Sequence, residues 1–540
     1  MFNHSSRGRQ KRLSAEREEM EQRIGGVLLS TVAEPLELEP EPEPEAHSAP
    51  QLAAPEVVEM PPQHTELGGG FGLLDDDVVV NILLHLPWRG MVSMAQVCRR
   101  CPSLCEHAAE LKAQEHPNHA LLSRRSDESA VQLLSYICGM DSYLAAGARA
   151  VASAKHSALI SAAGDVLSCG DGDAGRLGQG LSSIAEGTAT LEVVAGLPRV
   201  VQVAAGVAHT AALDTQGRLW TWGFGEAGRL GHGESLDELV PRAVAALDDI
   251  RLCAVSAGGA HTAAVSIDGD LYMWGALSEF DEPQLVPRQL PTGGSAISSV
   301  SCGGGTLACV SRDGALLVCG HLVQTSRLTL IASPTANLRL HVSSVCVGGS
   351  SSKATSDFLA VLTVLGELYT LGHGEFGALG NGSEDDQKEL RLVELFAEQG
   401  VLVRSVSCGA AHAAAISTNG ALYVWGRGKY GRLGLGDRLD RLAPTQVEAF
   451  GAAFADCVAC GKEHTIIGLR NGDVYMCGRG DDGRLGTGNN HRQSLPRRLR
   501  GIKFMHIPQE GSDSQSEQHA IAMAIAETDG EFVAIDEDVV

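Results

Sequence analysis

The sequence lacks a long apolar run and a surplus of basic residues, and each deficit argues against a class of protein. The start of the chain is polar and its first apolar run, Val27 to Leu29, is far below spanning length, so we expect no signal peptide or membrane span. With 42 basic against 66 acidic residues the net charge is −24, which argues against a nucleic-acid surface over the whole molecule. The 14 cysteines have no regular paired spacing, which suits reduced thiols. We expect a soluble protein of the cytoplasm or nucleus.

The sequence also lacks the local motifs of common catalytic sites. It contains no phosphate-binding loop of the Walker type, no Gly-x-Ser-x-Gly elbow and no His-Glu-x-x-His pair. The cluster Cys98, Cys101, Cys105 and His107 has metal-ligand residue types, but its spacing on a helix does not form the knuckle of structural zinc sites. Cys457 and Cys460 would lie on opposite faces of a strand. We therefore predict a non-enzyme without metal or cofactor.

What the sequence does contain is a repeat. A histidine that follows a short apolar segment recurs at His156, His209, His261, His412, His464 and His519. The first and last lie 363 residues apart (519 − 156), which seven intervals of about 52 fill. Two decayed copies, with Thr306 and Ser351 in the histidine position, occupy the gap. Such a period indicates a solenoid or a propeller, because one unit cannot bury its own apolar face.

The content of one unit favours the propeller. Residues 203–244 hold four short strand candidates joined by turns, with period-2 patterns and no helix-length apolar stripe. A four-stranded blade repeated around an axis is a β-propeller, and we predict seven blades. Residues 516–535 read as the first half of an eighth unit. We expect strands of one terminus to complete a blade begun by the other, which would remove exposed edges.

A glycine-rich signature makes the prediction specific. Gly-x-Gly-x-x-Gly-Arg-Leu-Gly occurs at 170–178, 223–231, 426–434 and 478–486, and 372–380 differs only at Ala378. It resembles the repeat of the regulator of chromosome condensation family, over residues of about 150 to 535. The copies are followed by Leu-Gly rather than a helix, so a dinucleotide site is not expected. The units at 255–299 and 300–344 lack the loop, which leaves their shape open.

The chain divides into five parts. We predict a disordered acidic, proline-rich tail over 1–66, a helical segment over 67–120, a linker helix over 121–148, the propeller over 149–535 and an acidic tail over 536–540. The basic run at 7–12 is either a nuclear signal or part of the solvated tail.

The helical segment resembles an F-box. The resemblance rests on an apolar helix pair around a Leu-Pro step, although Leu74-Asp75 replaces the usual Leu-Pro and Cys101 stands near the usual Trp. It implies docking to the Skp-type adaptor of a cullin-RING ubiquitin ligase. The expected adaptor-binding residues are Leu74, Ile82, Leu83, Leu86, Pro87, Met91 and Val97. The alternative is a plain helical cap that packs on the propeller.

Within the propeller we expect sameness to indicate scaffold and difference to indicate function. The repeated histidines are expected to be buried and satisfied by neighbouring backbone, and Arg176, Arg229, Arg432 and Arg484 to be structural. The glycine loops differ at charged positions, which form either a protein-binding rim or ordinary solvated tips. The candidates are Asp171, Asp173, Glu226, Glu375, Lys429, Asp481 and Asp482.

Three functions fit these features. The first is an adaptor whose helical segment docks a ubiquitin-ligase core while the propeller holds an unidentified protein substrate. The second is guanine-nucleotide exchange on a Ran-type small GTPase, the activity of the family's founding member, with residues 352–357 as a candidate wedge. The third is a scaffold without a ligase connection. The repeat alone does not decide among them.

Overall fold

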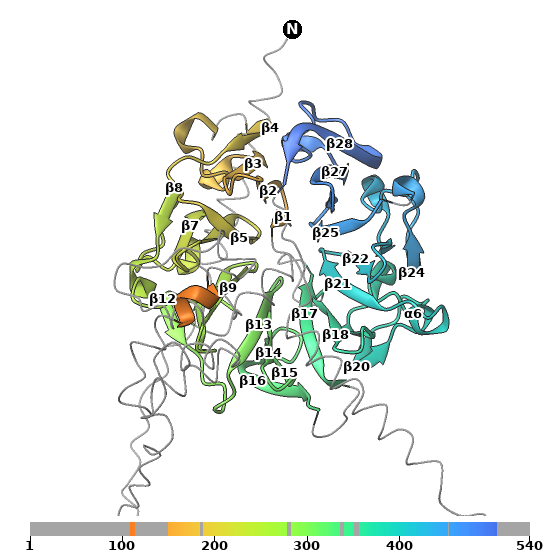
Figure 1. Cartoon of the computed structure of the whole chain (residues 1–540), viewed down its shortest axis with the longest axis horizontal. Coiled ribbons are helices and arrows are strands. Elements are labelled where there is room, and N and C mark those ends of the chain that lie inside the picture. The colour runs from red at the N-terminus through yellow and green to blue at the C-terminus, as the bar shows by residue number, and fades with distance from the viewer. Residues whose placement is uncertain are drawn as a thin grey trace, which may run out of the picture. The chain divides into compact units, whose positions relative to one another are not determined.

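The ordered part of the chain is a ring of seven sheets. The computed structural model describes residues 108–113, 149–183, 187–277, 282–334, 340–349, 356–451 and 453–504. Within residues 149–504, twenty-eight strands form seven antiparallel sheets of four strands each. The sheets stand around a common axis as the blades of a propeller (Figure 1). The predicted all-β, seven-bladed fold is confirmed.

Each blade is a run of four consecutive strands. The first four blades are β1 Ala150–Ala152, β2 His156–Ile160, β3 Val166–Gly170 and β4 Thr188–Val193; β5 Val200–Ala205, β6 His209–Asp214, β7 Leu219–Gly223 and β8 Glu238–Ala243; β9 Leu252–Ala257, β10 His261–Ser266, β11 Leu271–Gly275 and β12 Gln284–Gln289; β13 Ile297–Cys302, β14 Thr306–Ser311, β15 Leu316–Gly320 and β16 Thr325–Ala332. The last three are β17 Val342–Gly348, β18 Phe358–Thr363, β19 Leu368–Gly372 and β20 Gln387–Leu392; β21 Val403–Cys408, β22 His412–Ser417, β23 Leu422–Gly426 and β24 Arg441–Gln446; β25 Ala455–Cys460, β26 His464–Leu469, β27 Asp473–Gly478 and β28 Gln493–Lys503.

Turn chemistry sets the register inside a blade. In blade two, His209 pairs with Gly223 and Leu213 with Leu219 across β6 and β7. The Asp214 carboxylate accepts hydrogen bonds from the backbone N–H groups of Gln216 (2.8 Å) and Arg218 (2.9 Å), which fixes the turn between these strands. Since a slip of one residue would move every side chain to the opposite face, this turn decides which residues face the next blade.

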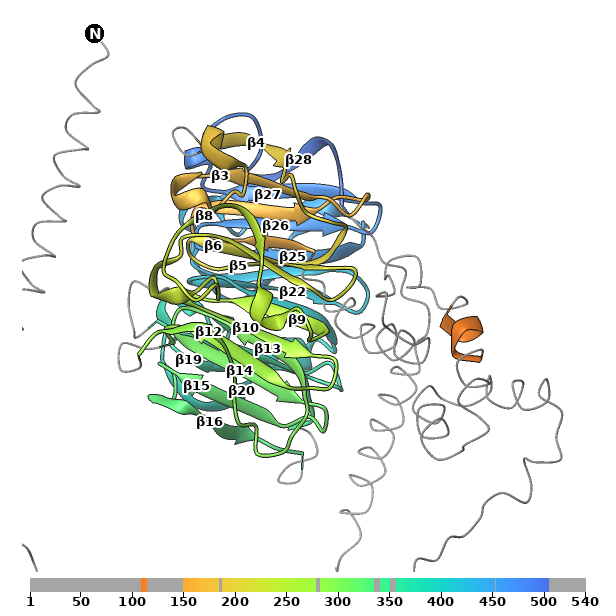
Figure 2. The same ribbon diagram turned by 90° about the vertical axis from the view of Figure 1, so that its left-hand side faces the viewer.

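The core lies between blades rather than on one side of a sheet. Every residue of β6, β10, β14, β18, β22 and β26 is buried, because neighbouring blades cover both faces of these second strands. A strand covered on both sides reads as a continuous run of small apolar residues, as in His-Ala-Ala-Ala-Ile-Ser of β22. The fourth strands are largely exposed and form the outer rim of the disc, which Figure 2 shows from its side.

Within residues 149–504 the ring closes without a shared blade, so the predicted completion of one terminal blade by strands of the other terminus is wrong in this respect. β1–β4 and β25–β28 are each complete sheets of consecutive strands. They meet through backbone contacts instead: the N–H of Lys462 donates to Ser153 (3.0 Å) and that of Ala162 to Lys503 (3.1 Å). Residues 516–535, on which the prediction was based, lie outside the described residues.

The two units without a glycine loop are also regular blades. β9–β12 and β13–β16 are four-stranded sheets like the others, so the missing loop changes only a connection and leaves the sheet intact. Antiparallel order brings two kinds of connection to one side of the ring: those between the first and second strands and those between the third and fourth strands. We call this side the loop face. It carries the glycine loops.

Two short helices complete the described part. Residues 108–113 are helical, which overlaps the end of the predicted helical segment, and α6 Glu394–Glu398 follows β20. Across the described ranges, no helix has the length and apolar character needed to span a membrane.

Candidate functional site

The repeated histidines join each blade to the next. The imidazole Nε2 of His156 lies 2.8 Å from the hydroxyl of Thr210, and that of His209 lies 2.8 Å from Thr262. His412 contacts Thr465 in the same way, at 2.9 Å. All five described repeat histidines are fully buried, as expected. For four of the five, all except His261, the partner is a hydroxyl of the following blade and not neighbouring backbone, because the histidine of one blade points across the interface.

The same hydroxyl also bonds a backbone carbonyl of the blade that carries the histidine. Thr210 donates to the carbonyl of Arg176 at 3.0 Å, Thr262 to that of Arg229 at 2.8 Å and Thr465 to that of Arg432 at 2.7 Å. A threonine therefore satisfies two groups of the preceding blade at once. Such a fully bonded polar chain in a low-dielectric interface favours one blade-to-blade geometry.

Burial keeps the imidazoles neutral. Burial, with Arg176 as a further cause, lowers the pKa of His156 to about 3, and burial lowers the pKa of His209 and His412 well below the usual range. No group of three or more metal-ligating side chains occurs in the described part of the chain. The histidines thus serve as structural hydrogen-bonding groups.

The repeated arginines are buried clamps, as their sameness predicts. The Nε of Arg432 donates to the carbonyl of Lys429 in its own loop (3.0 Å), and its Nη1 donates to the carbonyl of Lys462 in the next blade (2.6 Å). Arg229 makes the same pair of bonds, to Glu226 and Gly259. The clamp holds the glycine loops of blades two, six and seven against the next first-to-second-strand connection.

The glycines of the loop allow close approach between blades. A side chain on Gly431 would place its Cβ 2.5 Å from the Cα of Ser494 in β28, and Gly431 has a φ of +80°. The loop of blade six therefore packs directly on the outer strand of blade seven, and only glycine fits there. The glycine at this position of the signature thus serves the packing of one blade on the next.

The chain of histidines and hydroxyls is interrupted in blades three to five. Leu307 stands where a threonine would face His261, and neither ring nitrogen of His261 has a partner of ordinary geometry among the described residues, although the main chain of Thr306 is near. Thr306, in the histidine position, instead donates to the carboxylate of Asp357 at 2.8 Å. Burial raises the pKa of Asp357. This sector thus uses a different bonding scheme.

The predicted loop residues all lie on the loop face, but their surroundings differ. Asp173, Glu226, Glu375 and Lys429 each begin a short 3-10 turn and are exposed. Asp171 and Asp481 are partly covered and pair with Lys155 (2.8 Å) and Arg479 (2.7 Å). Asp482 pairs with Arg484 at 2.9 Å. Their role in partner binding stays a prediction.

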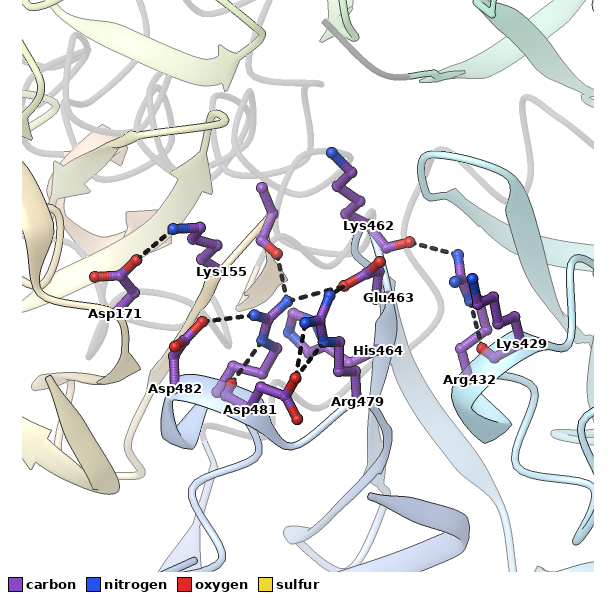
Figure 3. A network of polar contacts seen from close by, with 12 residues as sticks. Lys155, Asp171, Lys429, Arg432, Lys462, Glu463, His464, Arg479, Asp481 and Asp482 are labelled. Carbon is purple, nitrogen blue, oxygen red and sulfur yellow. Dashed lines mark hydrogen bonds and ion pairs between the residues drawn. The ribbon is translucent and has the colours of Figure 1, made fainter. Parts of the chain in front are cut away.

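Figure 3 shows how these pairs join at the seam of the ring. Glu463 accepts from Arg479 at 2.6 Å and lies 3.4 Å from Arg484. Arg484 also donates to the carbonyl of Ala154 in blade one (2.7 Å). The ion pairs of Glu463, Arg479 and Arg484 thus lie within blade seven, and they hold the Arg484 guanidinium where it bonds the backbone of blade one.

Sequence reasoning missed two aromatic residues of this face. Each glycine loop has a residue with positive φ directly after the first turn residue: Ala174, Ala227, Phe376, Tyr430 and Asp482, with φ between 57° and 68°. Phe376 and Tyr430 are bulky in a conformation that side chains rarely adopt. The available signal was an aromatic residue at a loop position where other copies carry alanine or aspartate.

The predicted adaptor-binding residues lie outside the described residues. Leu74, Ile82, Leu83, Leu86, Pro87, Met91 and Val97 all precede residue 108, as do the cysteines at 98, 101 and 105. The F-box-like segment therefore stays a prediction from sequence.

Comparison with known proteins agrees with the fold. Residues 237–531 match the RCC1-like domain, and 163–213 and 200–229 match the regulator of chromosome condensation (RCC1) repeat. The chain is 28% identical to the ultraviolet-B receptor UVR8 of Arabidopsis thaliana over 75% of this chain and 78% of that protein. It is 28% identical to the E3 ubiquitin-protein ligase HERC2 of Homo sapiens over 64% of this chain, but this spans only 6% of HERC2.

A solved structure gives the same picture. Prp20p from Saccharomyces cerevisiae superposes with a TM-score of 0.57 and 18% identity, over 72% of this chain and 98% of that one. At this identity the likeness shows the fold alone. The family match covers more than half of the chain and coincides with the blades described above. The chain belongs to the RCC1-like domain family.

Proposed function

We propose that the chain is a protein-interaction adaptor that binds a protein partner through the loop face of its propeller. One observation carries this proposal: the positions that repeat from blade to blade are buried, and the positions that differ are largely presented on the loop face. Asp173 is 72% exposed, whereas Arg176, three residues later in the same loop, is 8% exposed. A rigid scaffold with variable exposed loops is the usual arrangement of a binding surface.

We further propose that residues 67–120 dock a Skp-type adaptor, which makes the chain a substrate receptor of a cullin-RING ubiquitin ligase. The support is the apolar helix pattern around Leu86-Pro87. An amphipathic helix in front of a complete interaction domain needs a partner for its apolar stripe, and an apolar groove of another protein supplies one.

The adaptor proposal is tested with the full chain and a purified Skp-type adaptor. The wild type should retain the adaptor on an affinity resin, and Leu86→Asp with Pro87→Ala should abolish retention because a carboxylate cannot enter an apolar groove. Lys429→Glu, in the propeller, is the matched control and should bind the adaptor normally. The ligase assignment fails if the wild type does not bind, or if the double variant binds as well as the wild type.

Guanine-nucleotide exchange is the second candidate. The connection between β17 and β18 holds nine residues, 349–357, whereas that between β5 and β6 holds three, 206–208. It lies on the loop face, where an insertion can reach into a bound partner. Of the candidate wedge residues 352–357, residues 352–355 lie outside the described residues. Release of labelled GDP from a Ran-type GTPase, with and without the full chain, tests this function, and an unchanged rate excludes it for that GTPase.

A further inference from the structure

On the loop face of blades five to seven, cationic side chains gather around two aromatic rings. The ring centroid of Tyr430 lies 4.8 Å from the guanidinium of Arg492, 5.0 Å from the ammonium of Lys429 and 5.1 Å from the guanidinium of Arg479. The guanidinium of Arg427 lies 4.0 Å from the ring of Phe376. These distances are within the range of cation–π contacts. Three consecutive blades therefore contribute to one patch.

The carboxylates of blade seven beside Tyr430 are already paired. Asp481 and Glu463 pair with Arg479, and Asp482 pairs with Arg484 (Figure 3). In contrast, four cations have no carboxylate within 4.0 Å among the described residues: Arg427, Lys429, Lys462 and Arg492. Lys429, Lys462 and Arg492 are exposed. The patch thus carries a local positive excess on a chain whose net charge is −24.

The aromatic residues are not required by the fold. Tyr430 has a φ of 68° and Phe376 a φ of 62°, and the same position is filled by Ala174 and Ala227 in blades one and two. Alanine meets the same backbone requirement with less crowding. A large ring at this position is therefore best explained by what it contacts on the surface.

We propose that the Tyr430 patch, formed by Phe376, Arg427, Lys429, Tyr430, Lys462 and Arg492, binds an acidic peptide segment of a protein partner. Carboxylates of the peptide pair with the four cations, and its main chain or apolar groups lie on the two rings. A short peptide is favoured over nucleic acid because a long polyanion would extend beyond the patch onto an acidic molecule, whose charge repels it. The inference rests on the proposed function in one respect, namely that the loop face binds protein.

Fluorescence anisotropy of the full chain tests the proposal. The probe is a fluorescein-labelled dodecapeptide of alternating Asp and Ser, compared with the same peptide carrying Asn for Asp and with a twelve-nucleotide oligo-dT. The Asp peptide should bind, and Lys429→Glu with Arg492→Glu should weaken its Kd by about tenfold or more because attraction becomes repulsion. Tyr430→Ala should weaken it about threefold to tenfold. The fold should tolerate the changes at 429 and 430, because other glycine loops carry glutamate and alanine at these two positions, and Arg492 is exposed.

A charge-matched control separates the patch from general electrostatics. Lys388→Glu with Arg391→Glu reverses two exposed cations on the outer strand β20 and should leave peptide binding unchanged. Equal losses in both double variants would overturn the proposal, as would equal binding of the Asn peptide or of oligo-dT. If Gln at positions 39, 41, 43 and 45 raises peptide affinity more than tenfold, the chain's own acidic segment occupies the patch and the partner assignment is wrong.

The outcome is independent of the ligase assignment. The substitutions at 429 and 492 do not touch residues 67–120, so capture of a Skp-type adaptor persists whether or not the peptide binds. A wild-type chain that captures the adaptor but does not bind the Asp peptide overturns only the patch, and one that binds the peptide but not the adaptor overturns only the ligase connection.

Discussion

His464 and Ser157 are hydrogen-bonded at 2.8 Å although 307 residues separate them in the sequence. The Ser157 hydroxyl also donates to the carbonyl of Arg484 at 2.7 Å. This is the same pair of bonds that Thr210, Thr262 and Thr465 make between neighbouring blades. The seam of the ring therefore has the chemistry of every other regular blade interface, with serine in place of threonine.

Removal of this hydroxyl should weaken the closed ring. Ser157→Ala leaves the Nε2 of His464 and the carbonyl of Arg484 without this buried partner, which costs about 1 to 3 kcal/mol of unfolding free energy. Ser157→Thr is the matched control, because threonine fills the same position in three other blades, and it should be neutral or stabilising. Urea unfolding followed by circular dichroism measures both. An alanine variant as stable as the wild type would show that the seam bond contributes nothing.

The neutral histidines should make the propeller acid-sensitive below pH 6.5. Burial lowers the pKa of His156 to about 3 and that of His261 to about 4. Between these values and the unfolded pKa of about 6.5, the unfolded chain binds more protons, so stability is fully present above pH 6.5 and is lost as the pH falls. Each such histidine contributes up to about 1.4 kcal/mol per pH unit.

The dependence is measured by urea unfolding at several pH values between 7.5 and 4.5. His209→Gln, which retains a side chain able to bond Thr262, should give a slope shallower by about 1.4 kcal/mol per pH unit. Equal slopes for the variant and the wild type would mean that His209 is not held neutral by burial.

The two kinds of histidine interface should respond differently to phenylalanine. His412→Phe removes the bond to Thr465 and should cost about 1 to 3 kcal/mol. His261→Phe should be neutral or stabilising by about 1 kcal/mol, since neither ring nitrogen of His261 has a partner of ordinary geometry among the described residues and no hydroxyl bond is lost. Phe358, and not Ser351 as predicted, fills the histidine position of blade five: it pairs with Gly372 and lies beside Gly348, as a histidine lies beside Gly409. Thermal unfolding of the two variants compares them directly, and equal destabilisation contradicts this account.

The architecture could be predicted because the sequence repeats with a fixed spacing, one unit for each blade. The fixed spacing of the histidines and the glycine loops led to seven four-stranded blades, including the two without a loop. The burial of His209 and Arg432 also followed, since a residue that is the same in every unit serves what every unit needs. These inferences depend on patterns within one unit, and such patterns recur at the same position in most of the units.

The contacts between copies could not be read in the same way. The partner of His156 is Thr210, 54 residues away, and nothing in a single unit says which neighbour a side chain faces. The residue after each histidine was the available signal: Ser157, Thr210, Thr262 and Thr465 carry a hydroxyl, whereas Ala413 follows a blade that has Phe358 in place of histidine. The closure of the ring was predicted wrongly for a related reason, since a surplus half-unit does not show where it pairs.

Each glycine loop packs on the next blade in chain order, and four of the five described repeat histidines bond a hydroxyl there. The Arg432 guanidinium bonds the backbone of Lys462, and the Arg484 guanidinium bonds that of Ala154. The last blade therefore contacts the first in the same way as any blade contacts the next. The contacts consequently run in one direction around the ring, and their chemistry does not distinguish the seam from the other regular interfaces. A circular permutant, opened at another loop between blades and joined at its natural ends, would keep the same contacts between blades. Only the position of the seam would change.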